Sequence, residues 1–477
     1  MIKIARIAVT LGLLSSLGAQ AYAAGLVVND NDLRNDLAWL SDRGVIHLSL
    51  STWPLSQEEI ARALKKAKPS YSSEQVVLAR INQRLSALKA DFRVTGYTST
   101  DQPGTPQGFG QTQPADNSLG LAFNNSGEWW DIHLQGNVEG GERISNGSRF
   151  NANGAYGAVK FWNQWLSFGQ VPQWWGPGYE GSLIRGDAAR PMTGFLMQRA
   201  EQAAPETWWL RWIGPWQYQI SASQMNKYTA VPHTKIIGGR LTFSPFQSLE
   251  LGASRIMQWG GEGRPQSFSS FWDGFTGQDN TGTDNEPGNQ LAGFDFKFKL
   301  EPTLGWPISV YGQMVGEDEA GYLPSANMYL AGVEGHHAWG KNAVNWYVET
   351  HDTRDDRSRT DYIYTHHIYK DGYYQQGYPL GDAMGGDGQL VAGKVELVTE
   401  DNQRWSTRLV YAKVNPENQL INKAFPHSDT LKGVQLGWSG DVYKSVRLNT
   451  NLWYTNADNS DSDDIGASAG IEIPFSL

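Results

Sequence analysis

The stretch "GFDFKFKL", residues 293–300, alternates between apolar and charged side chains from Phe294 onward. The two sets are Phe294, Phe296, Phe298 and Leu300 on the one hand, and Asp295, Lys297 and Lys299 on the other. Because successive side chains of a β-strand point to opposite faces, this pattern predicts a strand with one apolar and one charged face. Such a strand separates an apolar environment from a polar one.

The same two-residue period recurs along most of the chain after Asp91, for example in "WDIHLQGNVE" (130–139) and "SVRLNTNLWYT" (445–455). Alternation over about ten residues matches the length of a tilted membrane-spanning strand. A soluble β-sandwich also alternates, but it does not need so many ten-residue strands in series. We expect about eighteen strands, an even number typical of bacterial outer-membrane barrels. They lie near residues 92–98, 118–124, 129–139, 153–161, 164–170, 207–212, 216–223, 236–243, 248–257, 291–300, 307–315, 328–336, 343–351, 389–398, 404–413, 433–440, 444–455 and 465–475.

The connections between these strands alternate between short turns and long loops. The long loops are 99–117, 171–206, 258–290, 352–388 and 414–431. Outer-membrane barrels have short periplasmic turns and long extracellular loops. The sequence therefore predicts an all-β transmembrane barrel in the cell outer membrane, with its long loops extracellular. An even strand number returns both termini to the periplasm.

Three segments follow one another along the chain. Residues 1–23 carry a basic start, a short apolar run and the small-residue site "AYA", which predict a secretory signal peptide. Residues 24–91 place apolar side chains at helical spacing, as in "LSQEEIARALKKA" (55–67), which predicts a periplasmic helical module. Residues 92–477 form the expected barrel with its extracellular loops.

The composition agrees with this class of protein. The chain has no cysteine, but it has 20 Trp, 20 Tyr and 53 Gly. Its mean hydropathy is −0.47, because a barrel hides its apolar residues in alternation rather than in long runs. The net charge of −10 argues against nucleic acid as a partner.

No familiar catalytic motif is present, and we expect a protein that is not an enzyme, with no cofactor and no metal. The nearest approaches to a catalytic or metal-binding group are His336-His337, His351-Asp352 and His366-His367. Adjacent residues on a strand point to opposite faces, so a strand pair cannot share one site. Surface or interface histidines are the simpler interpretation.

Two long loops combine aromatic side chains with glycine, carboxylates and arginine. Sugar rings stack on aromatic faces, and their hydroxyls need carboxylates, amides and guanidinium groups. The polysaccharide-binding candidates are Trp174, Trp175, Tyr179, Arg185 and Arg190 in the first loop, and Tyr369, Tyr373, Tyr374, Tyr378 and Asp382 in the second. The alternative is that these loops fold inward, close the barrel and use tyrosine as filler; both interpretations remain open.

Three motifs, in order along the chain, resemble the Wzi family of group 1 capsule assembly. They are "LRNDLAWLSDRGVIHLSLSTWPLS" (33–56), "GQVPQWWGPGYEGSLI" (169–184) and "HHIYKDGYYQQGYPLGDAMGGDG" (366–388). The resemblance implies a barrel with a periplasmic helical bundle. It also implies a non-catalytic lectin that attaches capsular polysaccharide to the cell surface. Capsules of this group typically contain uronic acids, so the implied partner is an acidic capsular polysaccharide, with a functional link to the capsule export machinery.

We expect a monomer surrounded by outer-membrane lipid. Besides the lectin, two other functions remain open. An eighteen-stranded barrel has a wide lumen unless something fills it, which would suit a polysaccharide or nutrient channel. An outer-membrane hydrolase that acts on polysaccharide is the third hypothesis, with Glu180 or Asp187 as residues to test.

Overall fold

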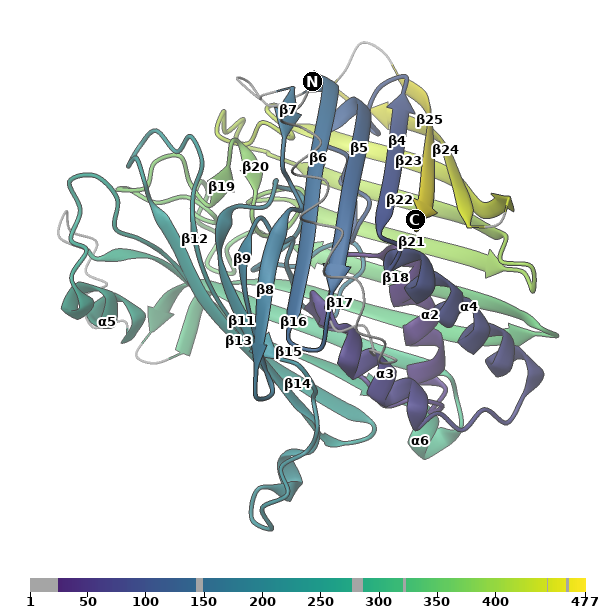
Figure 1. Cartoon of the computed structure of the whole chain (residues 1–477). Helices are drawn as coiled ribbons and strands as arrows, with labels where there is room; N and C mark the ends of the chain where they lie inside the picture. The colour runs from purple at the N-terminus through teal and green to yellow at the C-terminus, as the bar shows by residue number, and fades with distance from the viewer. Residues whose placement is uncertain (1–24, 143–148, 277–285, 321–322, 444, 460–462) are drawn as a thin grey trace, which may run out of the picture.

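The strands close into an antiparallel barrel and follow one another around it in chain order (Figure 1). The computed structural model describes residues 25–142, 149–276, 286–320, 323–443, 445–459 and 463–477, so the expected signal peptide lies outside the described residues. Within these residues, β7 and β8 both pair with β6 and together form one interrupted strand. Counted in this way, the described part of the chain has the eighteen strands that were expected.

The elements have the following bounds. The helices are α2 (Asn31–Asp42), α3 (Gln57–Lys65), α4 (Ser72–Leu88), α5 (Phe268–Thr276), α6 (Glu301–Leu304) and the 3₁₀ helix η1 (Arg211–Ile213). The barrel strands are β4 (Phe92–Ser99), β5 (Ala115–Ser126), β6 (Trp130–Glu142), β7 (Phe150–Asn151), β8 (Tyr156–Phe161), β9 (Gln164–Gly169), β11 (Thr193–Arg199), β12 (Trp216–Gln224), β13 (Lys235–Phe246), β14 (Leu249–Trp259), β15 (Gly288–Lys299), β16 (Ile308–Ala320), β17 (Leu323–Trp339), β18 (Asn342–Asp352), β21 (Gln389–Val398), β22 (Arg404–Val414), β23 (Asp429–Tyr443), β24 (Val446–Ala457) and β25 (Asp464–Phe475). The short strands β1 (Leu26–Val27), β2 (Thr52–Trp53), β3 (Leu55–Ser56), β10 (Trp174–Trp175), β19 (Tyr374–Gln375) and β20 (Tyr378–Pro379) form three small sheets apart from the barrel.

One expected strand is misplaced. The segment 207–212 is a turn followed by η1, and the strand instead is β11, inside the expected loop 171–206. The aromatic run "TWWLRW" has strand propensity, but Trp208 and Trp212 are exposed at the end of the barrel. Their rings belong to the membrane–water interface, not to a strand.

The alternating stretch at 293–300 has the predicted two faces, within β15 as far as Lys299. Phe294 and Phe296 are exposed on the outer surface of the barrel. Asp295 points into the lumen, where its Oδ2 lies 2.6 Å from Nη1 of Arg240. Lys297 also points inward, with Nζ 2.9 Å from Oδ2 of Asp42 in α2. The barrel therefore has an apolar outside and a charged, hydrogen-bonded inside.

Aromatic side chains mark the short-turn end of the barrel. Exposed residues at this end are Trp129, Trp162, Trp208, Trp306, Trp339, Trp405 and Tyr443. Amphipathic rings of this kind sit at the boundary between lipid and water, and barrels carry them in girdles. Among the described residues, no helix combines the length and the apolar character that a bilayer crossing requires.

The N-terminal helices lie at the short-turn end and reach into the lumen (Figure 1). Asp30 caps α2 by accepting a hydrogen bond from the backbone N–H of Leu33 at 2.8 Å. Nε1 of Trp39 donates to the backbone oxygen of His337 at 3.0 Å, and Oγ of Ser49 donates to Glu250 at 2.7 Å. The helical module is thus packed against the inside of the wall.

Long loops from the opposite end fold inward and meet these helices. We call residues 25–88, 100–114, 170–192 and 353–388 together the plug. Nη2 of Arg34 in α2 donates to the backbone oxygens of Pro177 and Gly178 at 3.0 and 2.8 Å. The same guanidinium lies 4.4 Å from the ring of Phe109 and 4.5 Å from that of Tyr179. One arginine therefore joins the helical module to two of the long loops.

Candidate functional site

The tryptophans of the first candidate loop are part of the plug. Trp174 and Trp175 form β10, which pairs antiparallel with β2. Trp174 packs edge-on against Phe109 at 5.2 Å between ring centroids, and Nε1 of Trp175 donates to Oε1 of Gln219 at 2.7 Å. Tyr179 stacks on Tyr347 at 4.7 Å. All three candidate rings are buried, so in this conformation they do not present a face to a ligand.

The tyrosines of the second loop are buried in the same way. The phenol of Tyr373 donates to the backbone oxygen of Ile184 at 2.8 Å, which ties the second loop to the first. Burial raises the pKa of Tyr369 to about 12, so this phenol remains protonated. Tyr374 is buried as well, whereas Tyr378 is half-buried in β20. Most of these rings therefore fill the interior of the barrel. This is one of the two interpretations that the sequence left open.

A buried carboxylate and histidine network holds both loops to β18. Glu349 accepts hydrogen bonds from the backbone N–H groups of Tyr179, Glu180 and Gly181. His351 lies between Glu349 and Asp382, with 2.6 Å between each nitrogen and the nearest carboxylate oxygen. Because both ring nitrogens are engaged and the ring is fully buried, this cluster positions the loops.

Among the described residues, two clusters of carboxylates and histidines are compact enough to consider a metal ion. In the first, Nδ1 of His366 accepts hydrogen bonds from the backbone N–H groups of Ile368 and Tyr369, which places its proton on Nε2, facing Glu286. A protonated nitrogen is not a metal ligand. In the second, around Asp42, lysine ammonium groups already neutralise the carboxylates.

A polar cavity remains in the lumen beside the plug. It consists of two neighbouring pockets of about 330 and 420 Å³, which share Asn29, Tyr97, Gly110, Thr112, Gln113, Asn449 and Glu472 as lining residues. The wall on this side is formed by β4–β6 and β21–β25. The larger pocket falls within the range of about 300–1,000 Å³ that is usual for small-ligand sites. It can hold a short saccharide segment.

Two candidate arginines line the larger pocket. Nη2 of Arg190 lies 2.6 Å from Oε2 of Glu139 on β6. Arg185 is buried, which lowers its pKa from the ordinary value, and the Tyr373 phenol partly opposes this shift. Burial raises the pKa of Asp187 to about 6, although its Oδ2 accepts hydrogen bonds from Asn29 and Gly110.

Several lining residues of the larger pocket carry buried polar atoms that have no hydrogen-bond partner among the described residues. These atoms are Asn29 Oδ1, Thr112 Oγ1, Gln173 Oε1, Arg185 Nη1, Asp187 Oδ1 and Arg190 Nε. Buried polar groups without partners are costly, so native proteins satisfy them with water or with a ligand. The six atoms are themselves buried in this conformation, so a ligand in the pocket would reach them only if neighbouring side chains moved.

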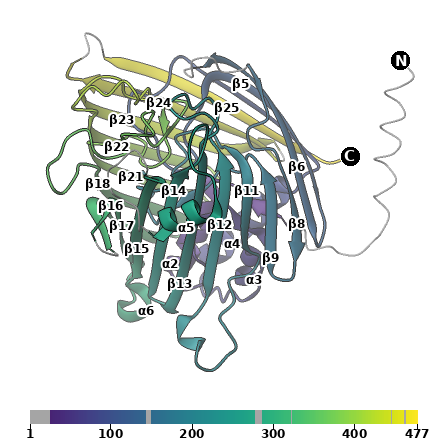
Figure 2. The same cartoon turned by 90° about the vertical axis from the view of Figure 1, so that its left-hand side faces the viewer.

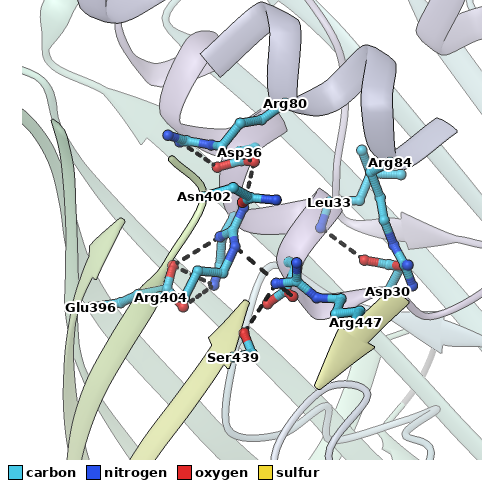
Figure 3. A network of polar contacts seen from close by, with 12 residues as sticks. Asp30, Leu33, Asp36, Arg80, Arg84, Glu396, Asn402, Arg404, Ser439 and Arg447 are labelled. Atoms are coloured by element: carbon cyan, nitrogen blue, oxygen red, sulfur yellow. Dashed lines mark hydrogen bonds and ion pairs between the residues drawn. The ribbon is translucent and has the colours of Figure 1, made fainter. Parts of the chain in front are cut away.

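Ion pairs form the floor of the smaller pocket and fasten the helical module to the wall (Figure 3). Asp36 of α2 accepts from Arg80 of α4 at 2.9 Å and from Arg404 of β22 at 2.5 Å. Arg404 also lies 3.2 Å from Glu396, and Arg447 of β24 lies 2.5 Å from Asp32. These pairs connect the helical module to the barrel wall beneath the cavity.

Part of this cavity could have been predicted from the sequence, through residues that were not among the polysaccharide-binding candidates. Gln135, Asn137 and Asn449 occupy the polar positions of alternating strands and line the pockets. The inward face of a barrel strand is where a lumen ligand is met. The residues contributed by the N-terminal segment, such as Asn29, carry no comparable signal.

A closed antiparallel barrel with an apolar, aromatic-edged outer surface and a polar interior is an outer-membrane β-barrel, here one whose lumen holds a plug and a polar cavity. Comparison with known families then places the chain more narrowly. It belongs to the capsule assembly protein Wzi family, whose model matches residues 89–468.

Two individual proteins are very similar to it. A protein of Klebsiella pneumoniae, described as an uncharacterized 55.8 kDa protein in the cps region, is 93% identical over 477 residues, which are 100% of this chain and 95% of that protein. A solved structure of Wzi from Escherichia coli is 89% identical, with a TM-score of 0.91, over 95% of this chain and 100% of that one. That protein is described as an outer-membrane protein involved in group 1 capsule assembly and as a carbohydrate-binding β-barrel.

Proposed function

We propose that this protein is a non-catalytic outer-membrane lectin that binds acidic capsular polysaccharide and attaches the capsule to the cell surface. Family membership and the carbohydrate-binding relative support this function. The observation that carries it for this chain is the polar cavity in the lumen, whose larger pocket is lined by Arg185 and Arg190 and by amide side chains such as Gln135 and Asn137. A saccharide would bind to this lining through its hydroxyl and carboxylate groups.

The orientation follows from the same proposal. The long loops face the outside of the cell, where the capsule lies, and both termini and the helical module are periplasmic. Arg185 and Arg190 then lie below the extracellular mouth and receive the end or a bend of a polysaccharide chain. The protein acts as a monomer in outer-membrane lipid and receives its ligand from the capsule export machinery.

The contents of the lumen disfavour the channel hypothesis. Apolar clusters of the plug, including Trp53, Trp175 and Tyr364, fill the region between the walls from both ends. The remaining cavity is a pocket of small-ligand size beside them. A protein built for steady transport would keep an open aqueous path.

A pair of variants tests the site. Arg190→Gln removes the cation and its ion pair with Glu139, whereas Glu139→Gln breaks the same pair but leaves the arginine in place. We expect Arg190→Gln to lower the affinity for purified acidic capsular polysaccharide several-fold and Glu139→Gln to preserve or raise it. Equal losses of affinity in the two variants would show that the ion pair maintains the structure of the pocket and that the arginine does not itself bind the ligand.

The cellular readout is capsule retention in a deletion strain that carries each variant. The assay compares cell-bound with released polysaccharide, and a heat-modifiability gel confirms that each barrel is folded. Folded Arg190→Gln protein that binds and retains polysaccharide like the unsubstituted protein would contradict the location of the site. Loss of binding by all folded variants and by the unsubstituted protein would contradict the function itself.

A further inference from the structure

The helix α5 lies on the outside of the barrel wall, between the ends of β14 and β15 (Figure 2). It contacts both strands at the long-loop end of the barrel. The helix is part of the loop that connects these strands, and it makes none of the proposed contacts with saccharide. Part of its surface is not covered by the wall and faces the surroundings of the barrel.

Strand alternation shows that the helix covers outward-facing side chains. Gln258 of β14 points into the lumen, where its Nε2 donates to the backbone oxygen of Gly372 at 3.0 Å. Its neighbours Met257 and Trp259 therefore point outward, yet both are buried. The ring of Phe271 packs edge-on against Trp259 at 5.8 Å, so the helix is what buries them.

The contact is close. A Cβ atom at Gly274 would lie 2.8 Å from Sδ of Met257 and 3.2 Å from Cγ of Pro287. A larger residue at this position would have to displace the Met257 side chain, so glycine favours the close approach. The helix therefore packs directly against the outer surface of the wall.

One face of α5 is aromatic, with Phe268, Phe271, Trp272 and Phe275 at the spacing of a single helix face. Phe271 and Phe275 contact the wall residues Trp259 and Arg255, whereas Phe268 and Trp272 form the part of this face that the wall leaves uncovered. Phe268 is 79% exposed and Trp272 is 51% exposed, and their rings stack at 6.5 Å between centroids. Two large exposed rings next to each other mark a surface that meets an apolar partner.

The surroundings of α5 identify that partner. Phe195, Ile220 and Leu241 are exposed on the outward faces of β11, β12 and β13, so the lipid-facing belt continues toward the helix. Two cations, Lys235 and Arg255, also lie on the outward face of the barrel wall at the same end. Nζ of Lys235 lies 5.6 Å from the centre of the Trp259 ring, and the Arg255 guanidinium lies 5.3 Å from that of Phe275. The cations belong to the neighbouring strands and not to the helix. Exposed aromatic rings with Lys and Arg close by are typical of a protein surface in contact with an anionic membrane.

We propose that α5 anchors the barrel in the outer leaflet, with Phe268 and Trp272 inserted among the acyl chains of a phosphorylated, anionic glycolipid. Lys235 and Arg255 lie at the height of its headgroup and attract its phosphates. This site is separate from the polar cavity in the lumen and does not depend on saccharide binding. It fixes the depth of the long-loop end relative to the lipid surface.

The absence of cysteine from the chain makes a direct test simple, because each introduced cysteine takes a nitroxide label without competition. Labels are placed in Phe268→Cys and Trp272→Cys, in Phe195→Cys as a lipid-facing reference on β11, and in Ser269→Cys as a matched control on another side of the same helix. The proteins are reconstituted in nanodiscs that contain lipopolysaccharide. Electron paramagnetic resonance measures the collision of each label with oxygen, which concentrates in lipid, and with a nickel chelate, which remains in water.

We expect the labels at 268 and 272 to resemble the reference at 195, with at least a threefold higher ratio of oxygen to nickel collisions than the label at 269. Equal ratios at 268, 272 and 269 would overturn the proposal. All four substitutions are at exposed positions, and a heat-modifiability gel confirms folding.

A second measurement tests the headgroup. Nickel collisions at 272 should decrease when lipopolysaccharide replaces phosphatidylcholine, and Lys235→Gln combined with Arg255→Gln should remove this decrease. No difference between the two lipids would overturn the assignment of the two cations.

Discussion

The substitution Asp36→Asn tests whether buried charge fastens the helical module to the barrel. The Asp36 carboxylate accepts from Arg80 at 2.9 Å and from Arg404 at 2.5 Å, and all three side chains are buried. Arg404 retains Glu396 at 3.2 Å after the change, but no other carboxylate is recorded in an ion pair with Arg80 among the described residues. The variant therefore leaves one buried guanidinium without a counter-ion.

The expected size of the effect follows from this geometry. Removing one partner of a buried ion pair typically costs about 3–5 kcal/mol, because the remaining charge stays desolvated. At about 1.4 kcal/mol for each tenfold change, the equilibrium for undocking of the module should shift by roughly 100- to 4,000-fold. The barrel strands pair through their backbones and should not share this shift.

Hydrogen exchange followed by mass spectrometry measures this opening directly, since amides in α2 and α4 exchange only when the module opens. We expect exchange in α2 and α4 to accelerate about 100-fold or more, and exchange in β12–β14 to remain unchanged. The control is Lys341→Gln, which breaks an exposed pair with Glu400 that is worth about 0–1 kcal/mol. If Asp36→Asn accelerates exchange no more than this control does, the ion pairs do not hold the module.

Three further predictions concern the plug and the cavity. Trp175→Ala removes a fully buried indole and its bond to Gln219, so it should lower the free energy of unfolding by about 3–5 kcal/mol, seen as a lower thermal midpoint; an unchanged midpoint would show that the first loop is not structural. Because the pKa of Asp187 is raised to about 6 from an ordinary 3.8, its contribution to stability is present below pH 4 and is lost as the pH rises through 6. The pocket is also less negative below pH 6, so an acidic saccharide should bind more tightly at pH 5 than at pH 7.5, and Asp187→Asn should abolish that difference in calorimetry. In planar bilayers the protein should show no steady open-channel current, and a current typical of an open porin would refute the filled lumen.

The barrel was predictable because its physical rule is local. Alternation at 293–300 predicted that Phe294 and Asp295 lie on opposite faces of one strand, and the structure confirms this, with Phe294 outside and Asp295 inside. The error at 207–212 has the same origin, because exposed tryptophans at a membrane interface resemble a strand when only the local sequence is considered.

The interior was less predictable because it depends on contacts between distant segments. Nothing near Trp175 in the sequence indicates that Gln219 will accept its hydrogen bond, or that Thr52 will pair with it in a small sheet. Aromatic loops rich in glycine suit a sugar and a packed core equally well. Only the structure separates Arg185 and Arg190, which line the cavity, from Tyr373, which supports it.

The contact between Arg84 and Glu472 links the two ends of the chain during biogenesis. Arg84 belongs to α4, which is made before any barrel strand, and Glu472 belongs to β25, the last strand, whose pairing with β4 closes the barrel. Nη1 of Arg84 lies 2.7 Å from Oε1 of Glu472, beside that seam. Docking of the module and closure of the seam therefore stabilise each other, because the same contact is complete only when both have taken place.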